Sequence, residues 1–256
     1  MVKVKNKQEL ELMKRSGQIA GQALKLAMDS IRVGVSGLEV DEIVKAEIYR
    51  LGGDLSYKTV PGYKWATCVT VNEQVVHGIP TERKFKEGDL VSVDLAVMFK
   101  GWHTDCAWSK LVKSEKGKGE SEDETEKFLK IGEEALDLAI KQAVEGNHIG
   151  DISAAIQTHI ETAGYSVVRS LVGHGVGATL HEDPEVPGYG KAETGSELKM
   201  GMTLAIEVIY TKGHYEVILE KDGWTVSTAD GSLGGLFEMT IVVGEKQAQV
   251  LTDWIK

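Results

Sequence analysis

The sequence predicts an α+β fold made of two similar halves, residues 1–113 and 125–256, that together form one domain over residues 1–256. Three observations support this prediction. Each half opens with apolar residues at helical spacing, and each continues with apolar, β-branched runs typical of strands. The second half also matches the first when Gly34 is aligned with Gly146. Neither half could bury its own sheet, so we expect the halves to share a core.

The first half begins with two predicted helices. Apolar residues fall at helical spacing from Gln8 to Ile31, and Gly34 ends that segment. The stretch Ser36-Gly37-Leu38-Glu39 has the form of a capping box, which marks the start of a helix. A second apolar stripe then runs from Val40 to Leu51 and stops at Gly52-Gly53.

Strands follow these helices, and the plan then repeats. The predicted strands of the first half are Thr67–Val71, Leu90–Phe99 and Trp102–Leu111. Residues Ser114–Glu126 are charged and lack an apolar pattern, which predicts a connector. Helical stripes next cover 128–144 and 152–163, and further strand-like runs close the chain.

The internal repeat extends into the strands. Residues 88–94 and 201–207 each start with a glycine and reach a carboxylate at the same position of an apolar run. The stretch His77-Gly-Ile-Pro80 likewise has a counterpart in His181-Glu-Asp-Pro184.

Composition limits the function classes. The formal net charge is −10, and such a surface repels phosphate backbones and anionic lipid, so we expect neither nucleic-acid nor membrane binding. The N-terminal residues show no signal peptide, and no apolar run approaches the ~20 residues that span a bilayer. Cys68 and Cys106 are too few for a disulfide framework and fit a reducing cytoplasm. We therefore expect a cytoplasmic protein, with a monomer as the default.

Four carboxylates lie in or at the start of apolar strands. Asp94 lies within LVSVDLAVMF, whose length and β-branching predict a strand buried on both faces. An ionised carboxylate there costs several kcal/mol unless it is paired or bound to a metal. An arginine or backbone donors could satisfy any one of them, but the chain has few arginines. The four are Asp94, Asp105, Glu207 and Glu238.

If all four carboxylates point inward, a cation is the simplest compensation. Carboxylates with one imidazole suit Mn²⁺, Fe²⁺, Co²⁺ or Zn²⁺, and two bridging carboxylates could hold two ions about 3.5–4 Å apart. The imidazole would be His174 in LVGHGVGATLHEDP, residues 171–184. A lone His-Gly pair is more often a turn with surface histidines. Here the adjacent glycines would let the backbone turn and let substrate approach.

The chain closely resembles the type I methionine aminopeptidases, which have the creatinase-like pita-bread fold. The resemblance covers essentially the whole chain through the motifs KQELELMKRSGQIAGQAL, VNEQVVHGIP, VSVDLAVMFKGWHTD, GHGVGATLHEDPEVPGYG and DGWTVSTADGSLGGLFEMTIVV. It implies pseudo-symmetric halves of helices and antiparallel strands around a central curved sheet. It also implies removal of the N-terminal methionine from peptides and nascent proteins, and hence proximity to the ribosome.

The resemblance also implies a dimetal site. In that pattern Asp105 and Glu238 bridge two divalent ions, and Asp94 completes the shell of one. His174 and Glu207 complete the shell of the other.

Three residues carry the expected chemistry around these ions. Glu207 would act as general base toward a water whose pKa the ions lower. His181 is expected to hydrogen-bond the carbonyl oxygen as it gains charge, and His77 to lie near the scissile nitrogen. The free N-terminus of the substrate would coordinate a metal, which restricts cleavage to the first residue.

Several positions depart from the family pattern around the expected side-chain pocket, and a less aromatic pocket predicts a wider or weaker methionine preference. Tyr63, Cys68 and Trp224 remain as candidate pocket residues, with core packing as the alternative for Cys68 and Trp224. Cys106 stands where Thr or Ser is common, and its role is open. The departures are Val60 and Pro61 in place of Tyr-His, Leu180 in place of Phe, Val208 in place of Pro, and Leu236 in place of Gln.

Three alternatives stay open. The first is a proline-directed dipeptidase or aminopeptidase of the same fold, although those normally carry a large extra N-terminal domain. The second is a binding protein that kept the fold and lost the metal, and the third is a metal-binding relative without turnover. We interpret Glu182 and Asp183 as a solvated turn. The remaining histidines are assigned to surface or helix positions: His103, His148, His159 and His214.

Overall fold

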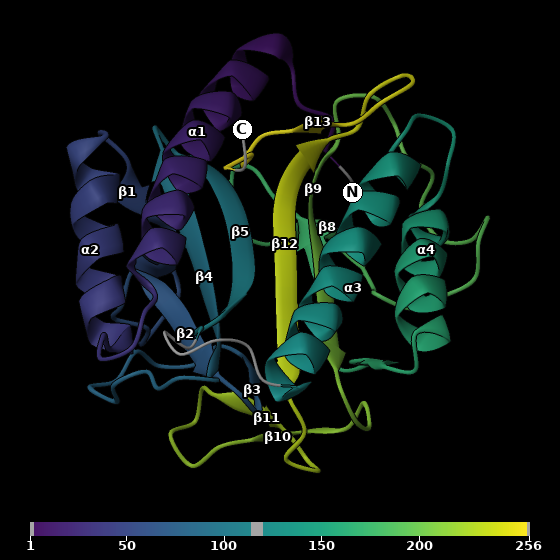
Figure 1. Ribbon diagram of the computed structural model, residues 1–256. Helices are drawn as coiled ribbons and strands as arrows, with labels where there is room; N and C mark the ends of the chain where they lie inside the picture. The colour runs from purple at the N-terminus through teal and green to yellow at the C-terminus, as the bar shows by residue number, and fades with distance from the viewer. Residues whose placement is uncertain (1–2, 114–119, 255–256) are drawn as a thin grey trace.

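The computed structural model describes residues 3–113 and 120–254, and places four α-helices against one face of a large sheet (Figure 1). The helices α1 and α2 belong to the first half and α3 and α4 to the second. Their bounds are α1 (Lys7–Ser30), α2 (Gly37–Arg50), α3 (Glu120–Gln142) and α4 (Ile149–Thr162), with a short 3-10 helix η1 (Ser56–Thr59) after α2.

In the described residues the large sheet has ten strands, and all of its pairings are antiparallel. The main path runs β1-β4-β5-β12-β9-β7-β8, while β2 pairs with β4, β6 with β9 and β13 with β12. Its strands are β1 (Asp54–Leu55), β2 (Thr67–Val71), β4 (Leu90–Phe99), β5 (Trp102–Leu111), β6 (Ser166–Val167), β7 (Gly173–Gly175), β8 (Glu182–Val186), β9 (Thr203–Thr211), β12 (Gly234–Val242) and β13 (Gln249–Val250). A smaller antiparallel sheet contains β3 (Gln74–Val76), β10 (Val217–Leu219) and β11 (Val226–Thr228).

The expected repeat is present in the structure. β5 and β12 meet at the centre of the sheet, and β4 and β9 flank them on either side. β1 pairs with β4 as β6 pairs with β9. Gly34 and Gly146 both have a positive φ, 83° and 88°, a conformation that glycine adopts without a steric penalty. The two halves therefore use the same turn before α2 and before α4.

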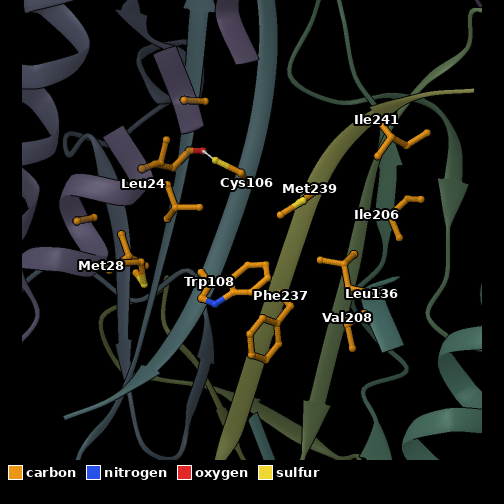
Figure 2. Close-up of a cluster of buried hydrophobic side chains, with 14 of the residues drawn as sticks. Leu24, Met28, Cys106, Trp108, Leu136, Ile206, Val208, Phe237, Met239 and Ile241 are labelled. Atoms are coloured by element: carbon orange, nitrogen blue, oxygen red, sulfur yellow. Dashed lines mark hydrogen bonds between the residues drawn. The ribbon is translucent and has the colours of Figure 1, made fainter. Parts of the chain in front are cut away.

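The sheet's helix-facing side holds the main core. Side chains alternate along a strand, so Cys106 and Trp108 of β5 point toward the helices, as do Phe237 and Met239 of β12 (Figure 2). They pack with Leu24 of α1 and with residues of the other helices. The alternate positions of the same strands face the other side of the sheet.

The one helix start that a capping box marked in the sequence is confirmed, because α2 begins at Gly37 directly after Ser36. Ser36 Oγ accepts from the Glu39 N–H at 3.3 Å, and Glu39 Oε2 accepts from the Ser36 N–H at 2.7 Å. An equivalent box between Asn6 and Glu9 starts α1.

One prediction about the connector is wrong. Residues 120–126 of the expected connector Ser114–Glu126 belong to α3, while 114–119 lie outside the described residues. The first turns of α3 are almost wholly charged, so the sequence has no apolar stripe there to mark a helix.

In the part of the chain that the structure describes, no helix combines the length and apolar character that crossing a bilayer requires.

Candidate metal centre

The four predicted carboxylates come from the four central strands and share one face of the sheet. Strand register places Glu207 of β9 opposite Glu238 of β12, Glu238 opposite Ala107 of β5, and Ala107 opposite Asp94 of β4. Residues two apart on a strand point to the same face, so Asp105 joins this row from β5. Like charges on adjacent strands repel, so this row destabilises the sheet unless a positive charge or protons neutralise it.

His174 reaches the same face from the next strand. It lies on β7 opposite Ala205, which is two residues from Glu207 on β9. Its Nδ1 donates to the carbonyl oxygen of Gly175 at 2.8 Å, and this bond leaves Nε2 unprotonated in the neutral ring. That Nε2 lies 3.6 Å from Glu207 Oε1. Ligand atoms of Asp105, His174 and Glu238 all lie within 4.8 Å of one another.

The glycines around His174 are required by close contacts. A Cβ at Gly173 would lie 2.5 Å from the carbonyl oxygen of Ala205, and one at Gly175 would clash with the backbone of Asp183. The short strand β7 is thus packed too closely between β8 and β9 for side chains at these positions. The glycines hold His174 at the sheet surface, rather than marking a loose turn.

The electrostatics of the carboxylate row fit a cation. Burial, together with the charges of Asp105 and Glu207, raises the pKa of Glu238 well above its usual value. Burial raises the pKa of Asp94 to about 6, and burial with neighbouring carboxylates also raises the pKa values of Asp105 and Glu207. Glu238 Oε1 is buried without a hydrogen-bond partner, which is costly for a carboxylate.

His174 is also suited to bind a metal. Burial, with a smaller contribution from His181, lowers its pKa to about 4, so the imidazole is neutral at physiological pH. A neutral imidazole with a free Nε2 and four buried carboxylates is the donor set that divalent Mn, Fe, Co or Zn prefers. The residues present therefore fit the metal ions that the sequence predicted.

The row forms the floor of a cavity of about 190 Å³. All five predicted ligands line it, and so do the other predicted site residues His77, His181, Tyr63, Cys68 and Trp224. The rings of His174 and His181 lie 4.4 Å apart. His77 has a φ of 57°, which a histidine adopts only at some energetic cost and which is often found at functional sites.

Tyr57 is a cavity residue that sequence reasoning missed. It lies in η1, and its hydroxyl donates to Asp94 Oδ1 at 2.5 Å. Its ring packs edge-on against Tyr63, which packs in the same way against Trp224. No periodicity or motif marks Tyr57, since η1 is a single short turn. The one sequence signal was an aromatic residue shortly before the predicted pocket segment.

The positions that depart from the family pattern fall into two groups. Val60 and Leu180 line the cavity. Pro61 is exposed, Val208 faces the helices in the main core, and Leu236 packs with Val75 and Ile209 beside the small sheet. The expectation that all five reshape the pocket is therefore wrong for these three. Tyr57 also adds a ring to the lining, which opposes the loss of aromatic residues at 60 and 180.

Cys106 packs in the core and does not line the cavity. Its side chain is fully buried on the helix side of β5, and its backbone N–H donates to Asp105 Oδ1 at 3.0 Å. The thiol therefore packs, while the backbone orients a predicted ligand.

Two further interpretations need correction. His103 is buried rather than exposed, and its Nδ1 bonds Ser56 Oγ at 2.7 Å. It lies two residues before Asp105 on β5, so its side chain points to the same face of the sheet. Its polar character did not suggest a buried position. Glu182 is not part of a solvated turn, because its carboxylate forms a buried ion pair with Lys5, far away in the sequence. The other histidines agree with the interpretation: His148 precedes α4, His159 lies on α4, and His214 is largely exposed.

A carboxylate-rich centre with one imidazole, on the floor of a cavity the size of one side chain, is typical of a metal-dependent hydrolase. The model of metallopeptidase family M24 matches residues 11–245, and the chain belongs to this family.

Relatives with high similarity cover nearly the full chain. A methionine aminopeptidase of Clostridium perfringens is 40% identical over 252 residues, which cover 98% of this chain and 99% of that protein. Methionine aminopeptidase 1 of Bacillus subtilis is 39% identical with the same coverage. The structure of a methionine aminopeptidase from Thermotoga maritima superposes with a TM-score of 0.93 at 40% identity, over 98% of this chain and 99% of that one.

More distant structures share the fold alone. A prolidase from Pyrococcus furiosus has a TM-score of 0.74 at 23% identity, and this chain covers 65% of its length. The predicted α+β pita-bread fold is confirmed by these similarities.

Proposed function

We propose that this protein removes the N-terminal methionine from peptides and nascent proteins with the help of two divalent metal ions. The observation that carries the proposal is the row of buried carboxylates and His174 on the floor of one cavity, with a carboxylate oxygen that has no partner. Family membership and the names of the full-length relatives support the same activity.

The proposed ligands are the five that the sequence predicted. Asp94, Asp105, His174, Glu207 and Glu238 would together hold the two ions. When bound, such ions supply Lewis acidity that polarises a peptide carbonyl and lowers the pKa of water. The neighbouring positions of Asp105, His174 and Glu238 support this assignment.

The protein's own residues would orient the substrate and move protons. Glu207 would accept a proton as general base. His181 would donate to the carbonyl oxygen as negative charge develops there, and His77 would bind near the scissile nitrogen. The positions of His77 and His181 on the cavity wall support these roles.

The cavity is suited to the side chain of the first residue. An apolar cavity of about 150 Å³ is enough to hold a benzene molecule, and this cavity of about 190 Å³ could accommodate a methionine side chain. Tyr63, Cys68 and Trp224 would contact that side chain, together with Tyr57. The prediction that Val60 and Leu180 weaken the methionine preference is tested with peptides that vary only in the first residue. A preference equal to that of ordinary family members would contradict it.

The central experiment separates this function from its alternatives. Metal-free protein is supplied with Mn²⁺, Fe²⁺ or Co²⁺ and assayed on Met-Ala-Ser and on Ala-Pro-Ala. We expect metal-dependent cleavage of the methionine peptide. Preferred cleavage of the proline peptide would favour a proline-directed peptidase, and metal binding without cleavage of either would exclude an aminopeptidase.

A matched pair of histidine variants checks the assignment. His181→Ala should lower kcat on Met-Ala-Ser by about 100-fold, because a donor to the developing charge is lost. His159→Ala removes a histidine from α4, outside the cavity, and should leave kcat unchanged.

We infer that the physiological substrates are nascent chains, which would bring the protein close to the ribosome. The cytoplasm is the corresponding location, and both cysteines are free, as a reducing compartment requires. We propose a monomer as the default assembly.

A further inference from the structure

A buried ion pair joins the N-terminal segment to the loop that carries His181. Lys5 Nζ lies 2.7 Å from Glu182 Oε2, and the two side chains are only 3% and 6% exposed. A buried ion pair adds little net stability, because both charges must leave water. The position of this pair, directly beside a proposed catalytic residue, therefore suggests a role in the site.

Glu182 organises the backbone on which His181 lies. Its Oε1 accepts from the N–H groups of Ala178 at 2.8 Å and Thr179 at 3.3 Å, while Oε2 binds the Lys5 ammonium. The Thr179 hydroxyl donates to the carbonyl oxygen of His181 at 2.9 Å. One carboxylate thus connects Lys5 to the turn that ends at His181.

Lys5 is itself held in place. Its backbone N–H donates to the carbonyl oxygen of Gly201 at 3.0 Å. A Cβ at Gly177 would lie 2.5 Å from Lys5 Cε, so the loop is packed directly against the lysine stem. The backbone N–H of His103 donates to the carbonyl oxygen of Gly177 at 2.7 Å, which ties the start of the loop to β5. The loop is therefore restrained at its start by β5 and at its centre by Lys5 and Glu182.

We propose that Lys5 and Glu182 are positioning residues that hold the His181 imidazole where it can donate to the carbonyl oxygen of the substrate. This inference rests on the proposed function. Neither residue lines the cavity, so their effect on turnover passes through His181. The five proposed metal ligands do not bond to either residue, so metal binding should not depend on the pair.

The test combines kinetics with a double-variant comparison. Lys5→Met and Glu182→Gln should each lower kcat on Met-Ala-Ser by about tenfold with little change in KM, since small displacements of a catalytic group are costly. The combined variant Lys5→Met with Glu182→Gln leaves no buried charge unpaired, and it should show a similar loss of kcat while remaining folded. Calorimetric titration should show that every variant binds Mn²⁺ with the same affinity as the parent protein.

A matched control removes an ion pair of equal length elsewhere. Lys84 Nζ lies 2.7 Å from Glu39 Oε2, with both side chains about half exposed. Lys84→Met should leave kcat, KM and Mn²⁺ affinity unchanged.

The His181→Ala background gives the decisive comparison. There, Lys5→Met should cause no further loss of kcat, because the residue through which it acts is absent. A tenfold loss of kcat on adding Lys5→Met to His181→Ala would overturn this inference. An unchanged kcat in the folded combined variant would also overturn it, and neither result would contradict the proposed function. Absence of Mn²⁺-dependent cleavage by the parent protein would overturn the proposed function and this inference with it.

Discussion

Tyr57 lines the cavity and also contacts the carboxylate row. Its ring lines the cavity, and its hydroxyl donates to Asp94, a proposed ligand. Hydrogen bonds of this kind orient a ligand, and their loss commonly reduces metal affinity by about 10- to 100-fold. We therefore expect Tyr57→Phe to weaken Mn²⁺ binding by about tenfold, as measured by calorimetric titration of the metal-free protein.

Tyr63 offers a control of the same chemical type. Its hydroxyl donates to the carbonyl oxygen of Thr67 and to Cys68 Sγ, and to no proposed ligand. Tyr63→Phe should keep the Mn²⁺ affinity of the parent protein. Equal losses in the two variants would show that the hydroxyl of Tyr57 has no special role at Asp94.

Glu238 should destabilise the metal-free fold at neutral pH. Burial and the neighbouring carboxylates raise its folded-state pKa above the unfolded value of about 4.3. The folded protein then binds the proton more tightly, so the stability from this group is complete below the unfolded pKa and is lost as pH rises through the folded pKa. Without metal, Glu238→Gln should thus be more stable than the parent protein above about pH 4.3.

The size of this difference should grow with pH. Each pKa unit by which the folded value of a group exceeds its unfolded value lowers the free energy of unfolding by about 1.4 kcal/mol once the group is ionised in both states. Urea unfolding of both metal-free proteins between about pH 5 and about pH 8 measures the trend. The exposed Glu87 supplies the control, since Glu87→Gln makes the same chemical change on the surface and should alter the free energy of unfolding only slightly. A gap between Glu238→Gln and the parent that stays constant with pH would contradict the prediction.

Helix α3 packs closely against the sheet at Gly132. A Cβ at Gly132 would clash with the ring and hydroxyl of Tyr210 and with the ring of Phe237. Tyr210 cannot easily withdraw, because its hydroxyl donates to the carbonyl oxygen of Phe128 at 2.7 Å. Alanine favours a helix over glycine by about 1 kcal/mol, but overpacking a core costs about 1–3 kcal/mol.

We therefore expect Gly132→Ala to lower the free energy of unfolding by up to about 2 kcal/mol, although alanine is the better helix former. Chemical denaturation measures the change. Asp137→Ala on the exposed side of α3 is the control and should be neutral or slightly stabilising. If Gly132→Ala were stabilising, the close packing of α3 on β9 and β12 would be contradicted.

The sequence predicted the strands β2, β4 and β5 well, and it marked the carboxylates inside strands, because both features depend on local patterns. The strands β2, β4 and β5 have the predicted bounds, since each is a continuous run limited by turns or charged residues. Asp94 and Glu238 were visible because a carboxylate is rare inside such a run. The five-ligand assignment itself stays a prediction until the metals are measured.

Other features depend on contacts that no local pattern reveals. The burial of Glu182 depends on Lys5, which lies at the other end of the chain, so the local sequence resembles a polar turn. Tyr57 enters the cavity from a single turn of 3-10 helix, which has no periodicity. Val208 and Leu236 could be separated from the pocket only once strand register and sheet curvature placed their side chains.

The proposed metal site joins the two halves of the molecule. Asp94 and Asp105 come from the first half and the other three proposed ligands from the second, and they meet across the central strands β5 and β12. A ligand that binds only the folded state stabilises it by about 2.7 kcal/mol at about 100 times its Kd. For a chain of this length, that corresponds to a rise in Tm of about 5–10 °C.

We expect Mn²⁺ at that concentration to raise the Tm of the whole protein as one unit, because the proposed ligands come from both halves and both halves share one sheet. Tryptophan fluorescence and far-UV circular dichroism should report the same shifted transition. Glu238→Gln, which breaks the site from the second half, should remove most of the shift, whereas Glu87→Gln should keep it. If only one probe moved, or if the rise in Tm with metal persisted in Glu238→Gln, the ions would not be bound where the carboxylate row indicates.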